Sequence, residues 1–335
     1  MKTRNYFMLS LIVLLTACNS LFIEDDPENS LEQNFEIFWS EFDRHYSFFD
    51  IKELDWQAAY DTNIQRVRGF TTEDELFTLL VELTLAFRDG HVDLYRSDRR
   101  ISHDFITGFP PNEPIGAANY LESVESPNST IQYGDISDTN LGYIRIFSFG
   151  APRNHYERID DAIAAFSEKD GIVIDVRDNG GGSDTNADRI ATRFMDQERT
   201  FRWVRYRNGA AHTDFSEWRK GTIEPEGTTY TKPVVILTNR KCFSSTESFI
   251  LSMKVRPDVT TMGGVTGGGS GNPIFRELPN GWTFRLSSWQ MVDANFNYIE
   301  EVGIAPDEEI FNPTTFANSG IDRILERAIA LLEGN

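Results

Sequence analysis

The chain has 335 residues, of which 40% are hydrophobic and 25% charged, with 24 glycines and 13 prolines. This composition is that of a folded globular protein and argues against a disordered or collagen-like chain. The formal net charge of −20 argues against a nucleic-acid-binding surface, because phosphate binding needs clustered Lys and Arg. Two cysteines, Cys18 and Cys242, are too few for a disulfide framework or a cysteine zinc site, and no His/Glu spacing suggests zinc. We therefore expect no metal and no cofactor.

The N-terminus has the pattern of a secretion signal. Two basic residues precede an apolar run at residues 6–16, which is too short to cross ~30 Å of bilayer hydrocarbon. The run ends in Leu-Thr-Ala-Cys at Cys18, which resembles the lipobox of bacterial lipoproteins. The resemblance implies a signal peptide at residues 1–17, a lipid on Cys18 and an acidic tether at residues 18–30. An unmodified cysteine beside an ordinary cleavage site is the alternative.

The expected location follows from this leader. We expect a protein held in the bacterial cell envelope by its N-terminal lipid alone, facing the periplasm or the outer-membrane surface. Nucleic acid is not an expected partner, and the acidic surface favours no particular oligomeric state.

Residues 31–100 have helical periodicity. Aromatic side chains recur at helical spacing in the first half of this range, at Phe35, Phe38, Phe42 and Tyr46. A capping box at residues 72–75 precedes a second apolar stripe. We predict an N-terminal helical bundle over residues 31–100, because a small bundle buries such stripes most simply.

The pattern changes in the rest of the chain. Prolines between residues 101 and 140 favour loops and short strands. From residue 141 onward apolar strand-like runs alternate with helical stripes, and a predicted hairpin spans residues 275–286. The predicted fold class is α/β, with a connecting region at residues 101–140 and an α/β core at residues 141–335.

Two loops behind predicted buried strands carry candidate chemistry. Residues 179–182, Asn-Gly-Gly-Gly, offer backbone N–H groups to an anion, although a flexible turn has the same composition. Ser244 lies at the start of a predicted helix, where the helix dipole favours a developing negative charge. Ser244-x-x-Glu247 is also a capping box, so the local context by itself favours an N-cap role for Ser244.

A serine nucleophile needs a base, and five histidines are available. His91 differs from the others because it closes Arg88-Asp89-Gly90-His91 directly behind an amphipathic helix. A glycine there allows a C-cap turn that projects the imidazole off the helix end. The local context alone also fits an exposed or capping histidine.

In combination, four motifs resemble the tail-specific or C-terminal processing serine peptidases. They are Asp-Gly-His at 89–91, Asp-Val-Arg-Asp-Asn-Gly-Gly-Gly at 175–182, Phe-Ser-Ser-Thr-Glu at 243–247 and Gly-Ile-Ala-Pro-Asp at 303–307. They occur in the family's order and the match covers residues 30–335. The chain is most similar to the tricorn-core branch, to which the repeats of interphotoreceptor retinoid-binding protein are related. The resemblance implies a crotonase-like ββα core with a mixed sheet and a peptide or protein substrate.

The resemblance also implies site residues. Ser244 would be the nucleophile, His91 the base and Glu300 the supporting carboxylate. The Ser/Lys pair of the processing branch is excluded, because the residue 25 positions after Ser244 is Gly269. The oxyanion would be held by backbone N–H groups, namely those of Gly181 or Gly182 and of Ser245.

The chain departs from the family pattern in two respects. The tricorn core has a serine immediately before the histidine, whereas this chain has Gly90, so Asp89 or Asp93 are alternative partners for His91. A full PDZ domain is not expected, because only about 50 residues separate His91 from the core. Cys242 is expected to be a packed residue and not a second nucleophile.

The favoured hypothesis is an envelope-anchored serine endopeptidase that works through a Ser/His acyl-enzyme mechanism. One alternative is a non-catalytic family member that binds an apolar ligand or a peptide, and another is a structural lipoprotein. The presence of both Ser244 and His91 favours the enzyme.

Overall fold

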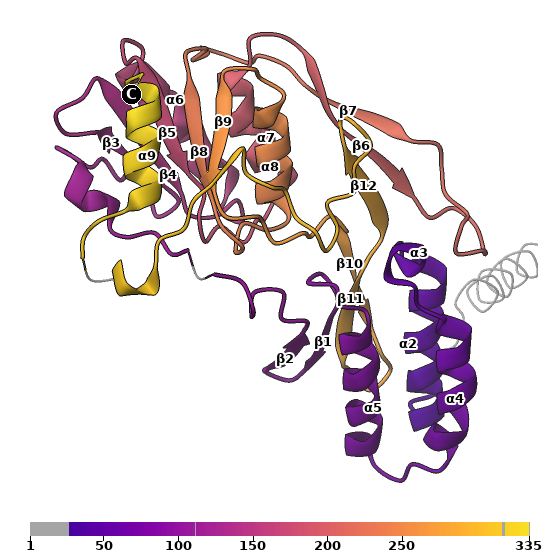
Figure 1. Ribbon diagram of the computed structural model, residues 1–335. Coiled ribbons are helices and arrows are strands. Elements are labelled where there is room, and N and C mark those ends of the chain that lie inside the picture. Colours follow the sequence, from indigo (N-terminus) through magenta and orange to yellow (C-terminus); the bar gives the residue numbers. More distant parts are fainter. Residues whose placement is uncertain (1–26, 111, 317–318, 335) are drawn as a thin grey trace, which may run out of the picture.

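The computed structural model describes residues 27–110, 112–316 and 319–334. The expected signal peptide and Cys18 lie outside these residues. Figure 1 shows two parts, an α/β part at the upper left and a helical part at the lower right. Strands of the C-terminal half run between the two parts. Among the described residues, no helix has the length and apolarity needed to cross a membrane.

The helical part consists of an N-terminal helical layer on a small antiparallel sheet. Its helices are α2 (Leu31–His45), α3 (Phe49–Lys52), α4 (Trp56–Arg68) and α5 (Glu73–Ala86). The aromatic stripe of α2 is fully buried, and the predicted capping box at Thr72 and Glu75 is present. The sheet has the order β10-β11-β1-β2, with bounds β1 (Asp93–Arg96), β2 (Arg99–Ser102), β10 (Pro273–Glu277) and β11 (Thr283–Ser287).

The predicted helical range is too long at its C-terminal end. The last helix stops at Ala86, and residues 93–102 form the hairpin β1–β2. Leu94 of β1 pairs with Phe284 of β11, and both side chains are fully buried under the helices. Residues 93–96 adopt the strand conformation because they pair with a strand almost 200 residues away. The periodicity of the local sequence does not indicate this pairing.

The α/β part is built on a six-stranded mixed sheet of order β13-β9-β8-β5-β4-β3. All pairs are parallel except β3 with β4. The strands are β3 (Ile131–Asp135), β4 (Leu141–Ile146), β5 (Gly171–Asp175), β8 (Val234–Thr238), β9 (Val259–Gly263) and β13 (Glu308–Glu309). The helices are α6 (Ile159–Ala165), α7 (Asp184–Ala191), α8 (Ser245–Lys254) and α9 (Arg323–Leu332).

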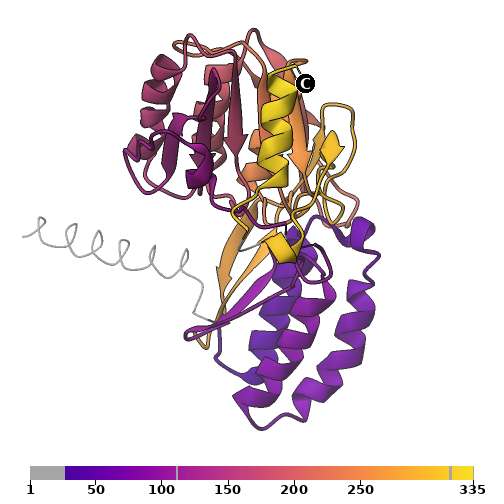
Figure 2. The same ribbon diagram turned by 60° about the vertical axis from the view of Figure 1, so that its left-hand side comes forward.

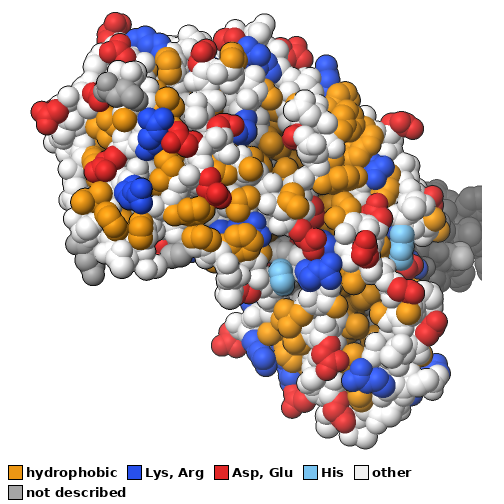
Figure 3. Space-filling model, viewed as in Figure 1, with side chains coloured by type: hydrophobic (Ala, Val, Ile, Leu, Met, Phe, Trp, Pro, Cys, Tyr) orange, Lys and Arg blue, Asp and Glu red, His pale blue; other side chains and the backbone are white. Residues whose placement is uncertain are grey.

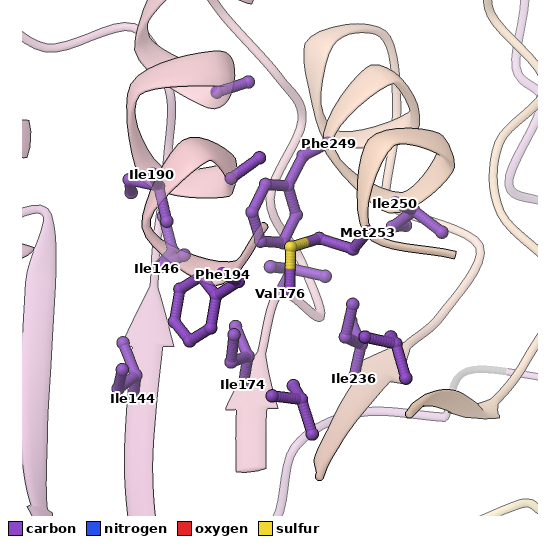
Figure 4. Packing of buried hydrophobic residues seen from close by; sticks show 14 of the residues in the cluster. Ile144, Ile146, Ile174, Val176, Ile190, Phe194, Ile236, Phe249, Ile250 and Met253 are labelled. Atoms are coloured by element: carbon purple, nitrogen blue, oxygen red, sulfur yellow. The ribbon is translucent and has the colours of Figure 1, made fainter. Parts of the chain in front are cut away.

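Helices cover both faces of this sheet. Figure 4 shows isoleucines of β4, β5 and β8 packed against Phe249 and Met253 of α8 and Ile190 of α7. The opposite face is covered by α9, which crosses in front of the strands in Figure 2. The central strands are buried on both sides, which is why their sequences are continuous apolar runs.

A third sheet and short helices complete the structure. The sheet has the order β12-β6-β7, with bounds β6 (Arg199–Tyr206), β7 (Arg219–Ile223) and β12 (Trp289–Asp293). The short 3₁₀ helices are η1 (Ala117–Tyr120), η2 (Arg153–Arg158), η3 (Thr192–Phe194) and η4 (Thr314–Phe316). Between β2 and β3 the described residues form loops, η1 and isolated bridges, so this stretch contains no PDZ domain. The α/β fold class is confirmed.

The acidic excess is not gathered into one patch on the face shown in Figure 3. Acidic and basic side chains alternate across both parts of the molecule there. Exposed ion pairs such as Arg68 with Glu32 account for some of this mixing.

Candidate active site

The two loops with candidate chemistry lie side by side, because they follow neighbouring parallel strands. The glycine loop follows β5 and the Ser244 loop follows β8. Asn179 holds them together: its carbonyl accepts hydrogen bonds from the Phe243 amide (3.2 Å) and the Thr246 hydroxyl (3.0 Å). Asn179 is fully buried. The carboxyl ends of parallel strands thus form the floor of the site.

Ser244 faces the imidazole of His91. The distance between Ser244 Oγ and His91 Nε2 is 3.0 Å, although 153 positions separate the residues. Ser244 has a φ of 58°, which is rare for a residue with a side chain and indicates local strain of the kind found at functional sites. Ser244 is the N-cap of α8 and forms a capping box with Glu247, and its hydroxyl is also within hydrogen-bond distance of His91. Ser244 is therefore more than a helix cap.

His91 comes from the helical part, between α5 and β1, and its side chain is almost fully buried. Its ring packs against Phe243, with ring centroids 4.6 Å apart. A Cβ at Gly90 would lie 2.8 Å from the rings of both Phe105 and Phe243. These rings leave no room for a serine side chain at position 90. Burial lowers the pKa of His91 to about 4, and the negative charge of Asp89 opposes this shift.

The second ring nitrogen of His91, Nδ1, is buried and has no hydrogen-bond partner among the described residues. Neither carboxylate suggested by the sequence binds it. Asp89 accepts from the backbone amide of His91 at 2.7 Å, and also from Tyr46 and Ser287. Asp93 pairs with Arg100 and Arg285 instead.

Glu300 is buried, and it contacts His91 neither directly nor through a hydrogen bond. Its carboxylate accepts from the amide (2.9 Å) and hydroxyl (3.0 Å) of Ser270 and forms an ion pair with Lys52 Nζ at 3.1 Å. Burial raises the pKa of Glu300 to about 8, as does Asp89, whereas Lys52 lowers it. Lys52 is itself fully buried and belongs to α3, so this ion pair joins the helical part to the α/β part.

Two backbone amides point to an anion site beside Ser244. Among the described residues, the amides of Gly182 and Ser245 donate to no protein acceptor. The amide of Gly181, the other predicted donor, is already used by Asn179 Oδ1 at 3.0 Å. A Cβ at Gly181 would lie 2.6 Å from the Phe243 carbonyl, so this glycine allows close packing and leaves the donor position to Gly182.

Glu247 fixes the backbone around the nucleophile. Its fully buried carboxylate accepts from the Ser244 amide (3.0 Å), the Thr266 hydroxyl (2.5 Å), and the amides of Gly268 and Gly269 (both 2.8 Å). Burial raises the pKa of Glu247 to about 7, while these hydrogen bonds oppose the shift. The glutamate of the Ser-x-x-Glu motif therefore ties the helix start to the loop at residues 266–269.

Cys242 is buried, and its thiol lies 3.1 Å from the Val176 carbonyl oxygen. Burial raises the pKa of this thiol, which disfavours the reactive thiolate. The geometry is that of a packed residue.

Ser244 and His91 lie in a cleft of about 1310 Å³ between the two parts of the molecule. Sequence reasoning missed several of its residues, because no motif signals them: Ser270, Phe105, Arg202, Asp184 and Asp188. The sequence likewise gave no indication of Lys52, whose partner Glu300 lies nearly 250 positions away.

Comparison with known proteins agrees with this geometry. The sequence matches the profile of Peptidase family S41 over residues 140–310. The chain belongs to peptidase family S41. Residues 27–84 match the Tricorn protease C1 domain, in agreement with the tricorn-like motifs. The family predicted from the four motifs is therefore confirmed.

Individual relatives extend the match. A solved structure of a putative peptidase from Parabacteroides merdae is 34% identical, with a TM-score of 0.82 over 91% of this chain and 97% of that one. The carboxy-terminal processing protease CtpA of Bacillus subtilis is 27% identical over 176 residues, which are 52% of this chain. The match spans only 36% of the length of CtpA. The structure of mature CPAF shares the fold, with a TM-score of 0.69 at 12% identity over 91% of this chain.

Proposed function

We propose that this chain is a serine endopeptidase in which Ser244 is the nucleophile and His91 the general base. The observation that carries the proposal is the 3.0 Å contact between Ser244 Oγ and His91 Nε2, at the start of α8 and inside the cleft. With the proton on Nδ1, the Nε2 lone pair accepts the proton of the serine hydroxyl as Oγ attacks a peptide carbonyl. His91 then donates this proton to the leaving amine, and water hydrolyses the acyl-enzyme.

The tetrahedral intermediate needs donors for its negative oxygen. The free amides of Gly182 and Ser245 fill this role, aided by the positive end of the α8 dipole. Glu247 holds Ser244 and the loop at residues 266–269 in place during the reaction. Glu300 supports the site through Ser270, whose amide and hydroxyl it binds at the cleft wall.

Binding of an apolar ligand without catalysis is less well supported. The cleft wall carries five charged side chains, which suit a peptide better than an apolar molecule. A pure binding protein also has no use for a strained serine beside a buried neutral imidazole.

The test of the proposal is hydrolysis of a peptide library, with new termini identified by mass spectrometry. Wild-type protein is expected to generate new termini, and Ser244→Ala is expected to generate none. Termini produced equally by both proteins would overturn the assignment of the nucleophile. A folded wild type that cleaves no peptide and reacts with no serine-directed probe would favour the binding-protein alternative.

The acid limb of the pH profile is expected to lie unusually low. Burial lowers the pKa of His91 to about 4, so the imidazole stays neutral and basic at pH values where an exposed histidine is already protonated. The loss of reactivity toward a fluorophosphonate that follows from protonation of His91 should therefore be centred near His91's own pKa. Circular dichroism at each pH controls for unfolding. A midpoint near the ordinary histidine value of about 6.5 would contradict this account.

We also propose that the protein is anchored in the bacterial cell envelope through a lipid on Cys18. The support is the Leu-Thr-Ala-Cys sequence behind a short apolar run. In a bacterium that processes lipoproteins, the wild type is expected in the membrane and detergent fractions. Cys18→Ser should move the protein to the soluble fraction or leave the precursor uncleaved. Identical fractionation and mass of the two proteins would exclude the lipid anchor.

A further inference from the structure

One side of the cleft carries charged groups that the proposed mechanism does not use. Asp184 and Asp188 lie one turn apart on α7, and Arg202 comes from β6. All three line the same cleft as Ser244, together with Ser248, which lies one turn after Ser244 on α8. Because α7 begins two residues after Gly182, these groups border the point where the substrate carbonyl would be held.

Arg202 forms an ion pair with Asp184. Arg202 Nη1 donates to Asp184 Oδ2 at 2.6 Å and to Ser248 Oγ at 3.0 Å. No ion pair joins Arg202 or any other described cation to Asp188. Arg202 also lies close enough to Asp188 to lower its pKa, but one guanidinium faces two carboxylates, so one negative charge remains in excess on this wall.

Asp188 is a carboxylate without a partner. Its Oδ1 is buried and makes no hydrogen bond within the described structure, while the side chain as a whole still lines the cleft. Burial raises the pKa of Asp188 to about 6, whereas the charge of Arg202 opposes this shift, so the group is mostly ionised at neutral pH. Partial burial of an unpaired anion is unfavourable in free energy, because the charge loses hydration. A ligand that supplies a cation or a hydrogen-bond donor to the carboxylate offsets this loss.

The cleft wall opposite α7 carries a net positive charge. Arg100 of β2 and Arg285 of β11 both pair with one carboxylate, that of Asp93, so one positive charge remains in excess there. A cationic side chain in the cleft is repelled from this wall and attracted toward α7. Trp289 and Met291 also line the cleft and offer apolar surface beside Arg202, whose guanidinium lies over the Trp289 ring at 5.5 Å and 3.7 Å from Met291 Sδ.

We propose that Asp188 is the specificity-determining residue of the subsite beside Ser244, and that this subsite takes the side chain of a lysine or arginine on the acyl side of the scissile bond. The methylenes of such a side chain pack against Met291 and Trp289, and its cation binds the Asp188 carboxylate. This inference rests on the proposed peptidase function.

The substrate side of the inference is tested with the wild-type protein. Cleavage sites in the peptide library should be enriched in lysine and arginine on the acyl side. In a matched pair of peptides, acetylation of that single lysine should lower kcat/KM by ~10-fold or more, because acetylation removes the charge while keeping the methylenes. Equal cleavage of the two peptides, or enrichment of aspartate and glutamate, would overturn the proposal; the latter result would assign the subsite to Arg202.

The protein side is tested with Asp188→Asn, which keeps the size of the side chain. The ratio of kcat/KM for the lysine peptide to that for the acetyl-lysine peptide should fall by ~10-fold in this variant. Asp61→Asn, at an exposed carboxylate of α4, is the matched control and should keep the wild-type ratio. A lysine preference that survives Asp188→Asn would refute the assigned role of Asp188.

Failure of this inference can be told apart from failure of the proposed function. Labelling of Ser244 by a fluorophosphonate does not depend on a lysine side chain. Labelling together with no preference for lysine would refute only the specificity. A folded wild type that is neither labelled nor cleaves any peptide would refute both.

Discussion

Replacement of His91 by alanine is expected to lower kcat/KM for peptide hydrolysis by ~10⁴-fold or more, and Ser244→Ala to do the same. The reason is that Ser244 Oγ has one basic partner, His91 Nε2 at 3.0 Å, and without it the hydroxyl keeps its proton. Because the two residues act as a unit, the double variant should be no slower than either single variant. Initial rates on one cleaved peptide provide the measurement.

The matched control is His45→Ala. His45 lies on α2 with a substantially exposed side chain, and its nearest ionic partner is Glu41. This variant should retain the wild-type rate. A loss of less than tenfold in His91→Ala, with the variant folded, would mean that another group takes the serine proton.

Removal of the Glu247 carboxylate is expected to lower the free energy of unfolding by about 3 kcal/mol or more. Glu247→Ala leaves one hydroxyl and three amides without their acceptor in a fully buried site. Urea denaturation of the wild type and the variant gives the difference. Glu198→Ala, at an exposed glutamate before β6, should change stability by no more than about 0.5 kcal/mol.

A second readout separates the role of Glu247 in the site from its role in stability. Under conditions where the Glu247→Ala variant remains folded, its Ser244 should still react more slowly with a fluorophosphonate, because the Ser244 amide has lost its acceptor. A change in unfolding free energy below about 1 kcal/mol would contradict the network described for this carboxylate.

The proposed nucleophile Ser244 and its proposed base His91 could be singled out from the sequence because each lies in a short local motif. Asp-Gly-His, Asn-Gly-Gly-Gly and Ser-x-x-Glu each occupy one turn after an element with clear periodicity, and the family resemblance joins them. The buried strands around Ile174 and Ile236 were equally visible, because strands covered on both faces are continuous apolar runs.

The supporting contacts were not predictable, because they depend on chain segments that meet only in the fold. The hairpin β1–β2 was included in the helical range, since its partner β11 is remote in sequence. Glu300 was predicted as a site residue, but no motif in the sequence indicated that Lys52 and Ser270 are its partners. The use of the Gly181 amide by Asn179 likewise appears only when the loop geometry is known.

The central claim is that Ser244 is a nucleophile activated by His91. The most direct measurement is reaction of residues 27–335 with a fluorophosphonate, followed by mass spectrometric mapping of the modified residue. The account predicts a single modification on Ser244, absent from Ser244→Ala and at least ~10³-fold slower in folded His91→Ala. Modification of a different residue, or an unchanged rate in His91→Ala, would contradict it.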